Sequence, residues 1–175
     1  MFCNLCLAVQ KKQLWVVQGE NGKGKTSLLK ALSGVLPLTC GKLTHQVPFW
    51  YKGHGLACDP HLLVKECLIQ EARRLNAMKN LEEVTKNLEL YDLLDKRLST
   101  LSQGQKQRFS FFRLFLQKRL LWILDEPFSF LDETWQETFK KYLKEHLQNE
   151  GSVVMALHPK STAPLEGVTT YVKLT

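Results

Sequence analysis

The residues most able to do chemistry form a loop rich in glycine and lysine. Residues 19–26 read Gly-Glu-Asn-Gly-Lys-Gly-Lys-Thr, the pattern G-x-x-x-x-G-K-[ST] of a phosphate-binding loop. Glycines let the backbone wrap closely around a polyphosphate, and the N–H groups that open the following helix attract the anion. We expect Lys25 to reach the β- and γ-phosphates and the Thr26 hydroxyl to ligate Mg²⁺. The residues predicted to bind the nucleotide here are Gly19, Asn21, Gly22, Gly24, Lys25, Thr26 and Ser27.

Two acidic residues, Asp125 and Glu126, follow a continuous apolar run over residues 120–124. Such a run is typical of a buried parallel strand, which would deliver both acids at its carboxyl end. Asp125 would then hold Mg²⁺, and the Glu126 carboxylate would polarise the water that attacks the γ-phosphate. Two acids at the end of a surface strand are also common, but the phosphate-binding loop upstream favours the nucleotide site.

The elements that must position these residues can be predicted from apolar periodicity. Strands are expected at about residues 2–9, 14–18, 43–51, 120–124, 152–157 and 168–174. Helices are expected at about residues 26–34, 62–75, 81–94 and 133–148, and after Gly104. Strand and helix alternate at both ends, with a helical insertion between them. The pattern therefore predicts an α/β fold with a mostly parallel sheet and a helical subdomain.

Composition sets broad limits on function. The chain has 175 residues, of which 44% are hydrophobic and 23% are charged, as in ordinary globular domains. No apolar run approaches the roughly 20 residues that span a bilayer, and we expect no signal peptide because Met1 to Val9 lacks a basic start. An ordinary solvated basic surface is the favoured interpretation of the net charge of +7, which also fits nucleic-acid binding or a basic face toward anionic lipid or nucleotide. The basic residues are spread out and form no nucleic-acid-binding module, so no nucleic-acid partner is expected.

The five cysteines are Cys3, Cys6, Cys40, Cys58 and Cys67. Their odd number predicts reduced thiols in a reducing compartment. Cys3-x-x-Cys6 has the spacing of a metal or redox motif, but no second pair of this spacing exists in the sequence. A structural role is therefore the favoured interpretation of these two residues.

A second glycine-containing segment makes the sequence resemble a known family. Residues 101–108 read Leu-Ser-Gln-Gly-Gln-Lys-Gln-Arg, which is similar to the L-S-G-G-Q signature of ATP-binding cassette (ABC) ATPases. The resemblance implies that Ser102, Gly104 and Gln105 contact ATP. Gln103 replaces the first glycine of the signature, a departure that would weaken one backbone contact.

Two further family features follow in order. Residues 127–132, Pro-Phe-Ser-Phe-Leu-Asp, resemble the D-loop with Asp132 at its aspartate, and His158 matches the histidine that contacts the γ-phosphate. The resemblance implies a P-loop NTPase fold and hydrolysis of ATP to ADP and phosphate with Mg²⁺. The implied catalytic residues are Lys25, Glu126 and His158, and the implied metal ligands are Thr26 and Asp125. In this family two cassettes form a head-to-tail dimer around two ATP molecules, so a homodimer is expected.

Within the ABC family, two segments resemble the ATP-binding subunit of the cytochrome c maturation haem exporter, the CcmA family. Trp50-Tyr51-Lys52-Gly53-His54 carries Gly-His where most relatives have a glutamine loop. His54 could keep the role of that glutamine, because a neutral imidazole offers one donor and one acceptor. Residues 121–128, Leu-Trp-Ile-Leu-Asp-Glu-Pro-Phe, also look like that family's stretch around the acids.

The resemblance also shows departures. The chain looks as if it begins at the family's second strand, without the strand whose aromatic residue stacks on adenine. Only 54 − 25 = 29 positions separate Lys25 from His54, which implies a trimmed antiparallel β subdomain. We expect one ABC domain over residues 1–175, with a core of about 1–56 and 119–175 and a helical subdomain of about 57–118.

The resemblance implies transmembrane partner subunits that handle haem. It also implies a peripheral location on the cytoplasmic face of a bacterial inner membrane, or on the matrix face of a mitochondrial one. Three alternatives stay open: an ABC ATPase of another import or export system, a soluble ABC protein acting on ribosomes or nucleic acid, and a cassette that binds ATP without hydrolysing it. The residues Lys25, Asp125, Glu126 and His158 argue against the last of these.

Overall fold

The computed structural model describes residues 5–158, 165 and 169–174. The chain divides into two compact units. The first, called the sheet unit, contains the described residues of Met1–Gly53, Arg119–Phe128 and Glu133–Thr175. The second, called the helical unit, contains His54–Lys118 and Ser129–Asp132. Each unit is described by itself.

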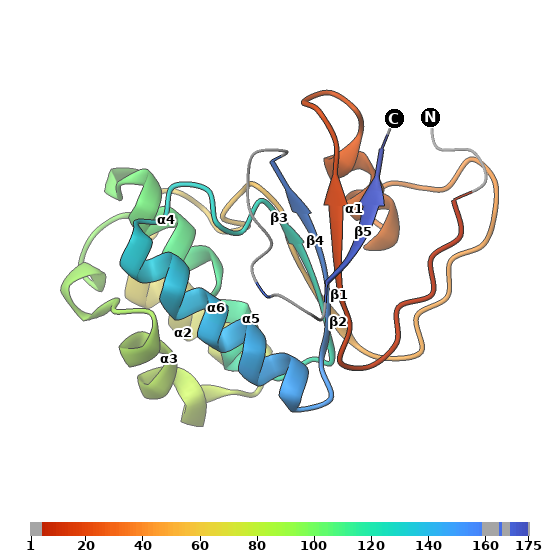
Figure 1. Ribbon diagram of the computed structural model, residues 1–175. Coiled ribbons are helices and arrows are strands. Elements are labelled where there is room, and N and C mark those ends of the chain that lie inside the picture. The colour runs from red at the N-terminus through yellow and green to blue at the C-terminus, as the bar shows by residue number, and fades with distance from the viewer. Residues whose placement is uncertain (1–4, 159–164, 166–168, 175) are drawn as a thin grey trace. The chain divides into compact units, whose positions relative to one another are not determined.

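A five-stranded parallel sheet forms the centre of the sheet unit, in the order β2-β3-β4-β1-β5 (Figure 1). The strands are β1 (Leu14–Gln18), β2 (Phe49–Lys52), β3 (Leu121–Asp125), β4 (Ser152–Leu157) and β5 (Thr169–Lys173). Each neighbouring pair of strands runs parallel, from β2 and β3 at one side to β1 and β5 at the other. The predicted α/β fold with a mostly parallel sheet is confirmed.

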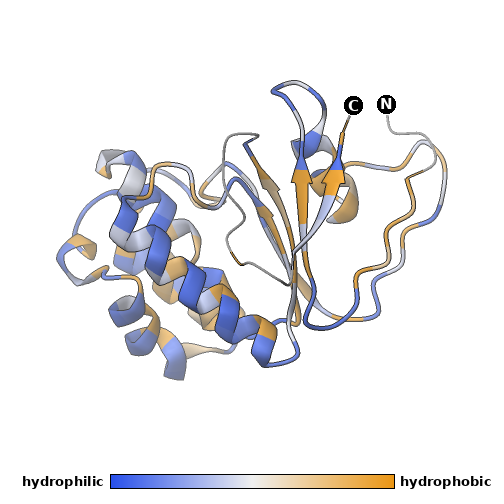
Figure 2. Ribbon diagram, in the orientation of Figure 1, coloured by the Kyte–Doolittle hydropathy of each residue, from blue (hydrophilic) through white to orange (hydrophobic). Residues whose placement is uncertain are grey.

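Burial explains why β3 and β4 form the middle of this sheet. Every residue of both strands is buried, and their sequences LWILD and SVVMAL are almost wholly apolar. A parallel strand covered on both faces requires such a run, whereas a half-exposed strand would alternate between apolar and polar residues. The hydropathy colouring draws the apolar residues of these two strands in orange (Figure 2).

Helices α1 (Lys25–Leu32) and α6 (Glu133–Gln148) cover opposite faces of the sheet. Leu28 and Leu29 of α1 lie in one apolar cluster with Ile123 of β3. The next side chain back along β3, Trp122, must point to the other face because strand side chains alternate. There it stacks on His146 of α6, with ring centroids 3.8 Å apart.

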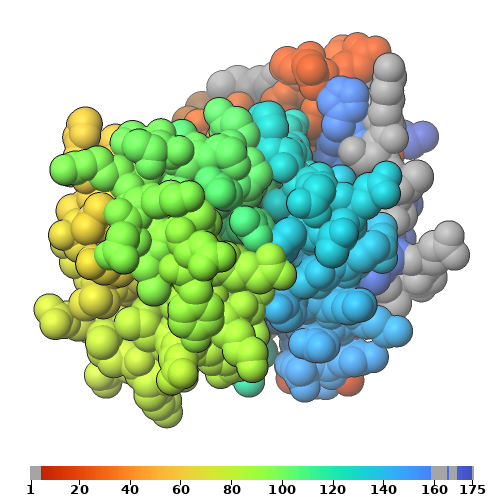
Figure 3. Space-filling model, turned by 90° about the vertical axis from the view of Figure 1, so that its left-hand side faces the viewer, coloured from red at the N-terminus to blue at the C-terminus, as the bar shows by residue number. Residues whose placement is uncertain are grey.

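The helical unit contains α2 (Val64–Arg74), α3 (Leu81–Asn87), α4 (Gln103–Ser110) and α5 (Phe112–Leu116), with short 3₁₀ turns at Met78–Asn80, Tyr91–Leu93 and Leu98–Thr100. Its core contains three phenylalanines with no exposed surface, Phe109, Phe111 and Phe112. The rings of Phe109 and Phe112 stack with centroids 4.8 Å apart. Figure 3 draws the surface of its larger segment, His54–Lys118, mainly in yellow to green.

Three predicted elements differ from those observed. Residues 5–9 form no strand, because this segment pairs with none of the described strands; residues 2–4 lie outside the described residues. The predicted strand over 43–51 is reduced to Phe49–Lys52, which pairs with β3. The predicted helix over 81–94 ends at Asn87.

The early end of α3 has a local cause. Glu89 has a left-handed backbone, with φ of 50°. Its N–H donates to the carbonyl of Lys86, and the N–H of Leu90 donates to that of Thr85. This is a Schellman motif, which satisfies the last carbonyls of a helix and turns the chain away. Glycine usually occupies the left-handed position, and a glutamate there gives no signal in the sequence.

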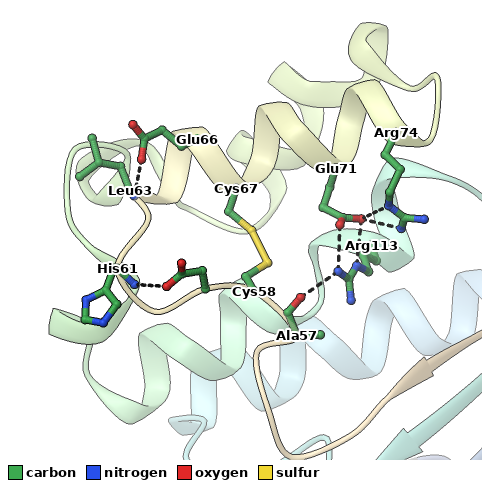
Figure 4. The surroundings of a disulfide bond; sticks show 10 residues. Ala57, Cys58, His61, Leu63, Glu66, Cys67, Glu71, Arg74 and Arg113 are labelled. Atoms are coloured by element: carbon green, nitrogen blue, oxygen red, sulfur yellow. Dashed lines mark hydrogen bonds and ion pairs between the residues drawn. A yellow bond between two sulfur atoms is a disulfide. The ribbon is translucent and has the colours of Figure 1, made fainter. Parts of the chain in front are cut away.

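The prediction of reduced thiols is wrong for two of the five cysteines. Cys58, in the loop before α2, forms a disulfide with Cys67 of α2, and their Cα atoms lie 6.7 Å apart (Figure 4). The fold brings them together because the loop turns back along α2, where Arg113 also donates to the carbonyl of Ala57 at 3.1 Å. Cys6 and Cys40 are exposed free thiols, and Cys3 lies outside the described residues.

An ion-pair cluster beside the disulfide holds the same loop to α5. The Glu71 carboxylate accepts hydrogen bonds from Arg74 and Arg113, and Arg113 also reaches the loop as described above (Figure 4). Burial alone raises the pKa of Glu71, but the two guanidinium groups outweigh it and hold that pKa below its usual value. The carboxylate is therefore kept charged where it connects α2 with α5.

Loss of this disulfide should destabilise the helical unit. The bond closes a loop with a sequence separation of 9, and loop-closure entropy for that length corresponds to about 2–3 kcal/mol. We expect Cys58→Ser to lower the free energy of unfolding by that amount, as measured by urea denaturation without reductant. Cys40→Ser, at an exposed free thiol, is the control. An equal effect of dithiothreitol on the wild type and on Cys58→Ser would contradict the assignment.

Candidate functional site

The phosphate-binding loop joins the end of β1 to the start of α1. Gly22 and Gly24 have φ values of 85° and 90°, a conformation that strongly favours glycine. Gly24 is the N-cap of α1, so the free N–H groups of the first helical turn open onto the loop. The loop therefore has the backbone that a bound polyphosphate requires.

Lys25 points its ammonium into this loop. The residue is 6% exposed, and its Nζ donates to the carbonyls of Gly19 at 2.7 Å and Glu20 at 3.2 Å. An ammonium has three donors, so these two bonds leave one for a phosphate oxygen. Thr26 is half-buried beside it, and Asn21 and Ser27 are exposed.

The parallel sheet brings the other predicted residues of the sheet unit to the same edge. All its strands run in one direction, so their carboxyl ends lie together. Asp125 at the end of β3 pairs with Ala156 of β4, which in turn pairs with Val17 of β1. The loop that follows β1 and the acids at the end of β3 therefore flank the end of β4, and the exposed His158 follows β4.

The two acids have different surroundings. Asp125 is 1% exposed, whereas Glu126 is only half-buried. Glu126 has a left-handed backbone with φ of 46°, which costs energy for a residue with a side chain. Its N–H donates to the carbonyl of Ala156 at 3.1 Å. The chain thus turns sharply between a buried carboxylate and one that reaches the surface.

Two residues at this edge were missed by the sequence analysis. Lys52, the last residue of β2, is 6% exposed, and its Nζ lies 3.4 Å from the carbonyl oxygen of Asp125. Burial lowers the pKa of Lys52 to about 8, although the carboxylates of Asp125 and Glu126 act in the opposite direction. Burial and the charge of Asp125 also raise the pKa of Tyr51. The sequence indicates this burial only indirectly: Lys52 directly follows three aromatic residues, Phe-Trp-Tyr, and so ends an apolar strand.

The signature segment of the helical unit forms the start of α4. The Oγ of Ser102, the N-cap, accepts from the N–H of Gln105 at 3.2 Å, and the Oε1 of Gln105 accepts from the N–H of Ser102 at 3.0 Å. This capping box leaves the hydroxyl proton of Ser102 available for a further acceptor. Gly104 lies in the first turn, where an added Cβ would be 2.9 Å from the carbonyl oxygen of Phe130.

A cavity of about 350 Å³ opens beside this segment, within the helical unit. Exposed His54 lines it together with side chains of α4 such as Gln103 and Lys106, and with Phe130. Asp132 is exposed and is not among the lining residues. The structure thus gathers Lys25, Thr26, Asp125, Glu126 and His158 in the sheet unit, and places His54, Ser102, Gly104, Gln105 and Asp132 in the helical unit.

The donor set of the sheet unit fits Mg²⁺ delivered with a nucleotide. Mg²⁺ keeps several waters and takes only one or two protein ligands besides phosphate oxygens. The Thr26 hydroxyl and the Asp125 carboxylate are oxygen donors of this kind. Among the described residues, no cluster of three or more histidine, cysteine or acidic side chains could hold a metal without such help.

Comparisons with known proteins agree on one family. The family described as "ABC transporter" matches residues 2–129. A cytochrome c biogenesis ATP-binding export protein CcmA of Reclinomonas americana is 31% identical over 173 residues, covering 90% of this chain and 78% of the relative. CcmA 2 of Cupriavidus metallidurans is 34% identical over 182 residues, covering 95% and 85%. The solved structure of an ABC transporter ATP-binding protein from Pyrococcus furiosus has a TM-score of 0.75 and 25% identity, covering 96% of this chain and 87% of that one.

The contact at Gly104 predicts that alanine is not tolerated there. Gly104→Ala should lower the free energy of unfolding by about 1–3 kcal/mol, because a backbone oxygen must move to admit the new carbon. The greater helix propensity of alanine acts in the opposite direction by up to about 1 kcal/mol. Gly55→Ala is the control, since an added Cβ there meets no heavy atom within 4 Å. Equal unfolding midpoints for the two variants would contradict the prediction.

Proposed function

Because this chain belongs to the ABC transporter family, we propose that it is the ATP-binding and ATP-hydrolysing subunit of a complex that exports haem for cytochrome c maturation. One observation carries the ATPase: the parallel sheet of the sheet unit brings Lys25, Asp125, Glu126 and His158 to a single edge. The haem pathway rests on the relatives, which are named CcmA export proteins. The domain would consist of a core of about residues 1–56 and 119–175 and a helical subdomain of about 57–118.

Each residue at the edge has a role that its position supports. The N–H groups of the loop and the Lys25 ammonium would bind the phosphates, and Thr26 and Asp125 would hold Mg²⁺. Bound Mg²⁺ neutralises charge that develops on the phosphates. The half-buried Glu126 would take a proton from the attacking water, and His158 would hydrogen-bond the γ-phosphate.

The helical unit would act on the nucleotide of a second copy. In a head-to-tail homodimer, the N–H groups of the first turn of α4 and the remaining hydroxyl proton of Ser102 are donors for a γ-phosphate. Gly104 would allow close approach of the backbone, and Gln105 fixes Ser102 through the capping box. Asp132 would lie in the contact between the copies, as the D-loop resemblance implies.

Membrane subunits complete the proposed complex. Among the described residues, no helix has the length and apolar character needed to cross a bilayer. The relatives are named export proteins, and on that ground we place the chain at the membrane surface, on the cytoplasmic or matrix face, through transmembrane partners. The cavity lined by His54 is the proposed place where closure of the cassettes is passed to these partners.

Two substitutions test the ATPase. Lys25→Ala should weaken ATP binding about 10- to 100-fold, because it removes a charge-assisted hydrogen bond to phosphate. Glu126→Gln should keep ATP binding and lower kcat by about 100- to 10,000-fold, because the general base is lost. Fluorescent-nucleotide titration and phosphate release measure the two effects. Lys30→Ala, at an exposed lysine of the same helix, is the control. Near-normal turnover of Glu126→Gln would exclude Glu126 as the base.

The haem pathway is tested by the partners. An affinity-tagged chain purified from detergent-solubilised native membranes should retain multi-spanning subunits of the cytochrome c maturation system, identified by mass spectrometry. Recovery of different permease subunits would keep the ATPase and reassign its pathway. Ribosomal or other soluble partners alone would overturn the membrane assignment.

A further inference from the structure

Lys52 is a buried cation at the edge of the sheet where the acids lie. It ends β2 and pairs with Leu124 of β3, one position before Asp125. Its side chain is 6% exposed, although an ammonium loses its hydration when it is buried. The groups that compensate must therefore lie close by. Its Nζ donates to the carbonyl oxygen of Asp125 at 3.4 Å, and the carboxylates of Asp125 and Glu126 both favour its charge.

The bonded carbonyl belongs to the peptide that joins the two acids. Because a peptide group is planar, its carbonyl and its N–H turn together. Here the carbonyl of Asp125 faces the Lys52 ammonium, while the N–H of Glu126 donates to Ala156 of β4. Contacts from β2 on one side and β4 on the other thus fix the orientation of this one peptide.

Glu126 needs such a constraint because its own backbone is strained. With φ at 46°, the residue would relax to a right-handed or extended conformation if its surroundings allowed. Relaxation would swing the carboxylate away from the edge of the sheet. The Ala156 bond holds the amide side of the turn, and Lys52 holds the carbonyl side.

We propose that Lys52 is a positioning residue for Glu126: its buried ammonium fixes the Asp125–Glu126 peptide and so directs the Glu126 carboxylate toward the water that attacks ATP. This inference rests on the proposed role of Glu126 as general base. Lys52 itself does not contact the nucleotide in this proposal. Its effect should therefore appear in the chemical step and not in nucleotide affinity.

The test compares kcat with nucleotide affinity in the full chain within its complex. Lys52→Met keeps an unbranched side chain one atom shorter than lysine but removes the charge and the donor. It should lower kcat about tenfold, since a misplaced base loses part of its effect, and leave the Kd for ATP within about twofold. Lys52→Arg keeps both the charge and the donor and should restore most of kcat. Lys141→Met, at an exposed lysine of α6, is the matched control.

A double substitution separates this role from a merely structural one. If Lys52 acts through Glu126, adding Lys52→Met to Glu126→Gln should cause little further loss of kcat. Wild-type kcat in Lys52→Met, or an equal tenfold loss on both backgrounds, would overturn the inference. If Lys52→Met fails to fold by circular dichroism, Lys52→Leu, which also lacks the charge and the donor, replaces it with the same expectations. Failure of the proposed function would appear separately, as normal turnover of Glu126→Gln itself.

Discussion

The parallel pairing of β3 with β4, and of β4 with β1, is the constraint on which the site depends. Parallel neighbours end on the same edge, so residues more than a hundred positions apart in sequence become neighbours in space. The apolar interior of β3 and β4 stabilises this arrangement, because every residue of both strands is buried. Polar groups are thereby confined to the strand ends. The candidate catalytic side chains lie at the strand ends because the apolar interior of the sheet cannot accommodate charged groups.

The local geometry at that edge depends on unusual backbone conformations. Gly22 and Gly24 adopt left-handed angles that open the loop toward an anion, and Glu126 adopts one despite its side chain. The glycines do so at little cost, whereas Glu126 needs hydrogen bonds from neighbouring strands. The same sheet that delivers Glu126 to the edge therefore also holds it in a conformation it would not adopt alone.

The sequence predicted those elements whose residue pattern is compatible with only one type of structure. Continuous apolar runs gave β3 and β4, and the glycine spacing of the loop placed it between a strand and a helix. Features set by tertiary contacts were not predictable: the left-handed Glu89 that ends α3, the pairing of Cys58 with Cys67, and the buried ammonium of Lys52. Glutamate and lysine are usual in solvent-exposed helices and loops, and the pairing of cysteines cannot be deduced from sequence alone. The catalytic roles of the strand-end residues stay predictions.

The disulfide between Cys58 and Cys67 makes the helical unit sensitive to the redox potential, to which neither the sheet nor ATP hydrolysis responds. Cys58 lines the same cavity as His54, so this part of the cavity wall is attached to α2 by a bond that reduction breaks. Unfolding of the helical unit is then linked to the thiol–disulfide potential of its surroundings, as an ionisable group links unfolding to pH. A change of about 30 mV in that potential shifts the ratio of the disulfide form to the dithiol form tenfold.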